Sequence, residues 1–109
     1  MTSKAERLRA LNDELRTTFI GGAVMITQGV EAIPIAKRQR ILQQVRTFSD
    51  FNDDNDPHGE HDCATLDAEG ERILFKIDYY DRDVNLHSPD PGDPAVTTRI
   101  LTIMLAREY

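Results

Sequence analysis

The segment ERILFKIDYY, residues 71–80, constrains the fold most strongly because its apolar and polar residues alternate. A period of two places the apolar side chains on one face of a β-strand and the polar side chains on the other. The apolar face would carry Ile73, Phe75, Ile77 and Tyr79. The preceding pair, Glu69-Gly70, suits a tight turn because glycine takes positive φ without steric cost. Residues 61–81 are therefore predicted to form a β-hairpin.

Two helices and a strand are predicted before this hairpin. A capping box at Ser3 and a stripe of leucines predict a helix from about Lys4 to Thr18. The segment AVMIT, residues 23–27, is short and rich in strand-forming residues, which indicates a strand. A second helix is predicted after Pro34 and ends before residue 50. Its buried face would consist of Ile41, Leu42, Val45 and Phe48.

The C-terminal part is predicted to be a loop followed by a helix. The three prolines of SPDPGDP, residues 88–94, exclude a helix or a central strand. Asp93 and Pro94 then suit the cap and first position of a last, well-buried helix. Its apolar residues would be Val96, Ile100, Leu101, Ile103, Met104 and Leu105. The fold class is thus α+β in a single domain, 1–109, with a small antiparallel sheet of about three strands, three helices and the order α-β-α-β-β-α.

The length and composition of the chain favour one cytoplasmic domain. A chain of 109 residues is long enough for one hydrophobic core and too short for two. It contains no apolar run of the roughly 18 residues that a membrane span needs. Its one cysteine, Cys63, cannot form an internal disulfide, which fits a reducing compartment.

The charges are distributed unevenly along the chain. Residues 1–49 carry eight Lys and Arg against four Asp and Glu, whereas residues 50–93 carry three against fourteen. Such an acid block disfavours direct contact with nucleic acid or membrane, because phosphate binding draws on clustered cations. A basic protein surface is the expected partner. A homo-oligomer, in which the basic second helix meets the acid block of a neighbour, stays open as well.

The segment DNDPHGEHD, residues 54–62, contains an alternative site for a divalent metal. Imidazole and carboxylate groups are ligands for zinc and similar ions, so His58, His61 and Asp62 form a candidate ligand set. With Glu60 or Asp78 as general base, this set would belong to a metal-dependent hydrolase.

Loop structure is the simpler interpretation of the same segment. Pro57 and Gly59 break any helix, and the spacing differs from that of helical zinc motifs. Asp, Asn and His side chains commonly make hydrogen bonds within turns. We therefore favour a loop with no cofactor and no catalytic residue.

The segment KIDYYD, residues 76–81, is the second polar concentration. Pairing of the hairpin around its turn places His61 and Asp62 opposite the end of this strand, near Asp78 and Tyr80. The two polar clusters should therefore meet, either as an active site or as an acidic patch with aromatic anchors. The partner-binding residues of such a patch would be Asp53, Asp54, Asp56, Glu60, Asp62, Asp78, Tyr80, Asp81 and Asp83.

Three blocks, FNDDNDPHGEHD, ERILFKIDYYD and SPDPGDPAVTTRILTIMLAREY, make the chain resemble an uncharacterised bacterial domain family of unknown function. The resemblance extends over nearly the whole chain. Cys63 stands where family members tend to have an aromatic residue, a change that concerns packing. Because this departure concerns packing, it leaves the interpretation of Asn55, Asp56, His58, Glu60 and His61 unchanged.

The resemblance implies a biological setting and no established activity. The family occurs largely on plasmids and other mobile elements, where short accessory proteins often counter host defences. Together with the acid block, this implies an accessory protein that acts as an acidic protein-binding module. Its expected role is anti-CRISPR or anti-restriction inhibition, in which it occupies the cationic nucleic-acid-binding surface of a host defence protein.

Overall fold

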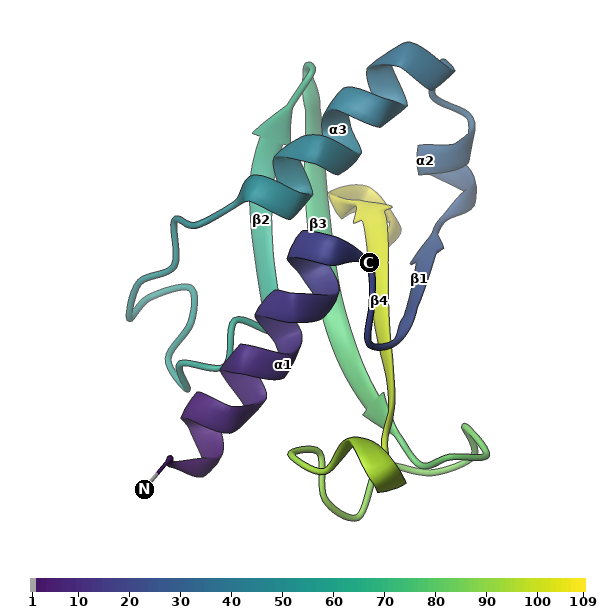
Figure 1. The fold of residues 1–109 in the computed structure, drawn as a ribbon. Helices are drawn as coiled ribbons and strands as arrows, with labels where there is room; N and C mark the ends of the chain where they lie inside the picture. Colours follow the sequence, from purple (N-terminus) through teal and green to yellow (C-terminus); the bar gives the residue numbers. More distant parts are fainter. Residues whose placement is uncertain (1) are drawn as a thin grey trace.

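Helices cover one face of a four-stranded sheet in the computed structural model, which describes residues 2–109 (Figure 1). The chain forms α1 (Lys4–Thr18), β1 (Ala23–Ile26), α2 (Gln28–Glu31), α3 (Ile35–Thr47), β2 (Cys63–Ala68), β3 (Glu71–Tyr80), the 3-10 turn η1 (Pro94–Val96), β4 (Thr98–Leu105) and the 3-10 turn η2 (Ala106–Glu108). The strands lie in the order β1-β4-β3-β2. β1 runs parallel to β4, and the other neighbours are antiparallel. The α+β class is thus confirmed.

The hairpin and the first two predicted helices are present. β2 and β3 are joined at Glu69 and Gly70, whose φ angles of 55° and 80° match the paired positive φ of a type I′ turn. α1 begins as its capping box predicts, because the hydroxyl of Ser3 accepts a hydrogen bond of 3.1 Å from the backbone N–H of Glu6. α3 occupies the range expected after Pro34.

The C-terminal helix prediction is wrong, because residues 98–105 form β4. Only the start was correct: the carboxylate of Asp93 caps a turn, but that turn, η1, is three residues long. Arg99, Leu101 and Ile103 are buried on one face of β4, and burial extends to both faces at its end, where Met104 and Leu105 are also buried. Buried residues on two faces of a central strand resemble the wide apolar surface of a buried helix. The β-branched residues Thr98, Ile100, Thr102 and Ile103 favour the strand.

This change makes the sheet four-stranded and mixed, instead of three-stranded and antiparallel. It also changes the order of helices and strands from α-β-α-β-β-α to α-β-α-α-β-β-β. The additional helix is α2, a single turn between β1 and α3 that was not predicted.

The hydrophobic core lies between the sheet and α1 and α3. Ile73, Phe75 and Ile77 on the predicted apolar face of β3 are buried. The helices contribute Leu15, Ile41 and Val45, which are fully buried. Each such side chain stabilises the fold by roughly 2 kcal/mol through burial of its apolar surface. None of the helices described in residues 2–109 is long and apolar enough to cross a membrane.

Candidate functional site at the acidic end

The acidic loop, residues 48–62, links α3 to β2 and is held by its own asparagines. The side-chain oxygen of Asn52 accepts hydrogen bonds from the backbone N–H groups of Asp54 and Asn55, at 2.9 and 3.1 Å. The amide of Asn55 donates to the carbonyl of Asp50 at 2.9 Å. Asparagine favours such turns because its short side chain reaches nearby backbone groups. The carboxylates of Asp53 and Asp54 therefore project from an ordered turn and are exposed.

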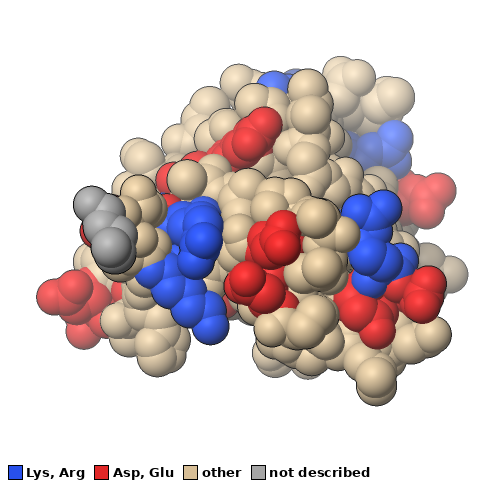
Figure 2. Space-filling model, turned by 60° about the horizontal axis from the view of Figure 1, so that its bottom comes forward, with Lys and Arg blue, Asp and Glu red and all other residues tan. Residues whose placement is uncertain are grey.

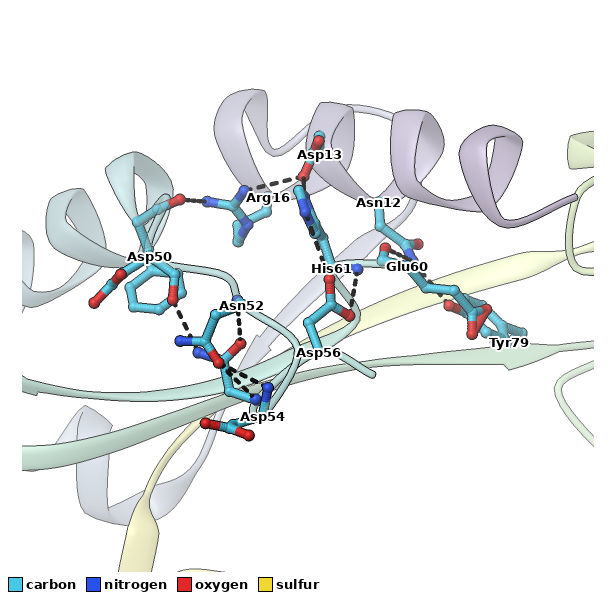
Figure 3. Close-up of polar contacts among 12 residues, drawn as sticks. Asn12, Asp13, Arg16, Asp50, Asn52, Asp54, Asp56, Glu60, His61 and Tyr79 are labelled. Carbon is cyan, nitrogen blue, oxygen red and sulfur yellow. Dashed lines mark hydrogen bonds and ion pairs between the residues drawn. The ribbon is translucent and has the colours of Figure 1, made fainter. Parts of the chain in front are cut away.

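The side chain of His61 connects the end of this loop to α1 (Figure 3). Its Nδ1 lies 2.8 Å from a carboxylate oxygen of Asp13, and its Nε2 lies 3.5 Å from a carboxylate oxygen of Asp56. The imidazole also stacks on Phe51, with ring centroids 3.9 Å apart and planes 6° from parallel. The backbone of His61 has φ of 55°, which turns the chain out of the line of β2. His61 and buried Asp56 are thus engaged within the fold.

The candidate metal ligands do not come together. His58 lines a hollow at the start of α1 with Lys4, Ala5, Leu8 and Glu60, whereas His61 contacts Asp13 and Asp56. Asp62 lines a different cleft, beside β3. In the described residues, no group of three or more His, Cys, Asp and Glu side chains is arranged to hold a metal ion. The alternative hydrolase hypothesis is therefore left without a ligand set.

The predicted meeting of the two polar segments does occur, in a cleft beside the end of β3. This cleft has a volume of about 300 Å³ and is lined by Asp62, Ile77, Asp78, Tyr79, Tyr80 and His87. At this cleft, the segment that pairs with the edge of β3 changes from the chain before β2 to the chain around Ser88. The N–H of Ile77 donates to the carbonyl of Asp62 at 2.7 Å, and the carbonyl of Tyr79 accepts from the N–H of Ser88 at 2.9 Å.

The carboxylates in and beside this cleft lie in partly dehydrated surroundings. Burial raises the pKa of Asp62, and the nearby carboxylates of Asp56 and Asp78 raise it further. Burial likewise raises the pKa of Glu60, with a further contribution from Asp62. Both shifts mean that the ionised form lacks part of its stabilisation by water. A cation placed beside Asp62 would restore that stabilisation.

Asp78 differs from Asp62 because it already has a cation beside it. Lys76, two residues earlier on β3, forms an ion pair with Asp78 on the sheet face opposite the helices. This hydrogen-bonded pair raises the pKa of Lys76. The cleft thus combines one paired carboxylate with one that has no ion-pair partner in the described residues.

Two cations of α3 form ion pairs with acids of the hairpin turn, and the other two donate to backbone carbonyls. Lys37 pairs with Glu71 at 3.4 Å, and Arg40 pairs with Glu69 beside the hairpin turn. Arg38 and Arg46 donate to backbone carbonyls. These contacts engage the four basic side chains of α3 within the fold. A homo-oligomer built on this helix would have to break them.

Five acids of the acidic loop have no ion-pair partner within residues 2–109, namely Asp50, Asp53, Asp54, Glu60 and Asp62. The surface around them is mixed in charge. Arg9 lies against Gly59 and Arg7 lies against Gly92, so cations of α1 border the acids. The view from this end shows separate groups of carboxylates with Lys and Arg beside them (Figure 2).

The predicted partner-binding residues divide into four groups. Asp62, Asp78 and Tyr80 line the cleft. Asp53, Asp54 and Glu60 lie on the acidic loop, and Asp81 and Asp83 lie on the loop that follows β3. Asp56 is buried against His61 and belongs to the scaffold.

A buried polar network behind the cleft was not predicted. Arg99 is 2% exposed, and its Nε donates to the side-chain oxygen of Asn12 at 2.8 Å. Its other contacts are the carbonyl of Pro91 and the ring of Tyr79. The amide of Asn12 donates to the carbonyl of Glu60 at 3.0 Å. The one signal in the sequence is that Asn12 lies one turn after Leu8, on the apolar side of α1.

Comparison with known proteins identifies one family. A family model described as "Protein of unknown function (DUF3768)" matches residues 26–108, from the end of β1 into η2. The matched part includes the acidic loop, the hairpin and the cleft. No curated protein and no solved structure matches the chain.

Proposed function

The chain belongs to the DUF3768 family of proteins of unknown function, and we propose that it is an acidic protein-binding module. Its binding surface consists of the acidic loop and the cleft beside β3. The partner presents Lys or Arg side chains to this surface. The module acts by occupying those cations and has no catalytic residue or cofactor.

The observation that carries this proposal is the separation of paired from unpaired carboxylates. Glu69 and Glu71, at the hairpin turn, are neutralised by α3. Asp53, Asp54 and Asp62, at the opposite end, have no ion-pair partner in the described residues, and burial disfavours the ionised form of Asp62. Unpaired carboxylates of this kind steer a basic partner and gain most from meeting one.

The target class follows from what the partner's cations would otherwise bind. A clustered cationic surface in a cell commonly serves nucleic acid. The family resemblance implies a plasmid or other mobile-element setting, which would make host restriction or CRISPR proteins the targets. In this role the module is an inhibitor that competes with DNA or RNA for the same surface.

The test compares two variants with the same change in net charge. The first, Asp54→Asn/Glu60→Gln/Asp62→Asn, removes three carboxylates from the proposed surface. The control, Asp67→Asn/Glu69→Gln/Glu71→Gln, removes three from the hairpin. Both variants and the unaltered chain are immobilised and exposed to a bacterial extract at increasing salt. Captured nucleic-acid-binding proteins are then purified, and their affinity for each of the three proteins is measured.

The unaltered chain and the control should bind purified basic proteins that the first variant binds weakly. Binding should weaken as salt rises, because the attraction is between exposed charges. Added DNA should compete with the module for its partner. Equal binding by both triple variants, or indifference to salt, would contradict the proposal.

A further inference from the structure

The tip loop, residues 81–87, follows β3 and presents two apolar side chains to solvent. Leu86 is 72% exposed and Val84 is 45% exposed. The loop is nevertheless ordered by hydrogen bonds to Asp81. The backbone N–H groups of Val84 and Asn85 donate to the carbonyl and carboxylate of Asp81, both at 3.0 Å. The apolar pair is therefore held in a defined position.

The backbone at Val84 is strained. Its φ is 58°, in the left-handed region that disfavours residues with a side chain and most of all those branched at Cβ. Asparagine or glycine would fit this conformation at lower cost. The sequence thus combines an unfavourable residue with exposure to water. Strained backbone of this kind clusters at functional sites, including those that hold a binding partner.

The neighbours of the tip loop indicate the chemistry of its occupant. Asp83 lies between the strained residue and β3, and it has no ion-pair partner in the described part of the chain. Arg82 donates to the carbonyl of Ala95 at 3.4 Å, which directs it toward η1. His87, at the end of the loop, lines the cleft that also contains Asp62. The apolar pair therefore adjoins the acidic surface.

We propose that Val84 and Leu86 are the anchor that inserts into an apolar patch of the partner protein, a patch bordered by Lys and Arg. The inference rests on the proposed function and narrows its partner. A purely polar polycation would pair with the carboxylates and leave Val84 and Leu86 exposed to water. A protein surface with apolar residues among its cations would pair with the carboxylates and also bury the two apolar side chains, so that apolar burial adds to the charge complementarity.

The test uses two synthetic peptides and two single variants. One peptide is an amphipathic helix with Leu on one face and Arg on the other; its control has Ser in place of every Leu, with the same charge. The unaltered chain should bind the Leu peptide more tightly than the Ser peptide. Leu86→Ser should lower affinity for the Leu peptide about tenfold and leave affinity for the Ser peptide unchanged.

Val84→Asn separates binding from folding. It should raise the melting temperature, since asparagine tolerates positive φ, and still weaken binding of the Leu peptide several-fold. Equal affinity of the unaltered chain for the two peptides, including no binding of either, would overturn the anchor. So would unchanged Leu-peptide affinity in both variants. The triple variant at Asp54, Glu60 and Asp62 tests the acidic surface independently, because its loss should affect both peptides alike.

Discussion

The hydroxyl of Tyr79 on β3 accepts a hydrogen bond of 2.8 Å from the side-chain amide of Asn12 on α1. The same amide holds the carbonyl of Glu60, so one buried asparagine connects the helix, the sheet and the end of the acidic loop. With Arg99 on its side-chain oxygen, Asn12 has partners for both of its polar atoms. The position of the cleft thus depends on a side chain that does not line it.

Replacement of Asn12 by Ala should destabilise the protein by about 3 kcal/mol, because Arg99 and Tyr79 would lose buried hydrogen bonds. Urea denaturation measures the change. Glu14→Ala, on the exposed side of the same helix, is the matched control and should lie within about 0.5 kcal/mol of the unaltered chain. A similar decrease in the free energy of unfolding in both variants would show that the Asn12 hydrogen bonds do not stabilise the fold.

Arg16→Lys should destabilise the fold by about 2 kcal/mol although the charge is kept. Arg16 is buried, and its Nη1 donates to the carbonyls of Val45 and Phe48 at 3.1 and 2.7 Å, where α3 ends. Lysine lacks the planar group that reaches these carbonyls together with Asp13. Thermal denaturation compares this variant with Arg107→Lys, an exposed control. A melting temperature equal to that of the control would refute the capping role.

Asp62→Asn should raise stability at pH 7 by less than about 1 kcal/mol, since the group is only half-buried and water screens it. Its raised pKa means that the ionised form costs free energy in the folded state, and this cost is present above the folded pKa. The cost disappears once pH falls below the ordinary value of 3.8. Denaturation at pH 7 and at lower pH should therefore show a difference that vanishes in acid. A difference that persists in acid would point to packing instead.

Tyr79 should be the source of a late-titrating tyrosine signal. Burial raises its pKa from 10.0 to about 12, so the folded protein keeps this phenol neutral after an unfolded chain has ionised it. Stability should accordingly fall between pH 10 and 12, relative to Tyr79→Phe. Tyrosinate absorbance measures the titration. A tyrosinate signal near pH 12 that persists in Tyr79→Phe would show that another tyrosine is its source.

The hairpin, α1 and α3 could be predicted because their signals are local. The alternation in β3, the pair Glu69-Gly70 and the capping box at Ser3 each specify backbone geometry within a few residues. β4 could not be predicted in this way. Its last three residues, Ile103 to Leu105, are all buried, which hides the strand alternation, and β4 pairs with β1, a strand from the other end of the chain.

The meeting of Asp62 with Asp78 and Tyr80 was predictable from hairpin register, and the cleft confirms it. The same register predicted that His61 would also lie near Asp78 and Tyr80, and this prediction is wrong. Its positive φ turns the ring toward Asp13 on α1, a residue 48 positions earlier in the chain. Buried Asn12 and Arg99 were missed for a similar reason, since their partners lie on different elements and no local pattern connects them.

Nuclear magnetic resonance mapping with the Leu-and-Arg peptide shows which carboxylates meet a basic partner. Amide shifts should concentrate in residues 53–62 and 78–87, and added salt should reverse those at the carboxylates first. The hairpin turn at Glu69 and Glu71 should remain unperturbed because its acids are already paired. Shifts centred on the hairpin turn, or spread evenly over all acids, would contradict the proposed binding surface.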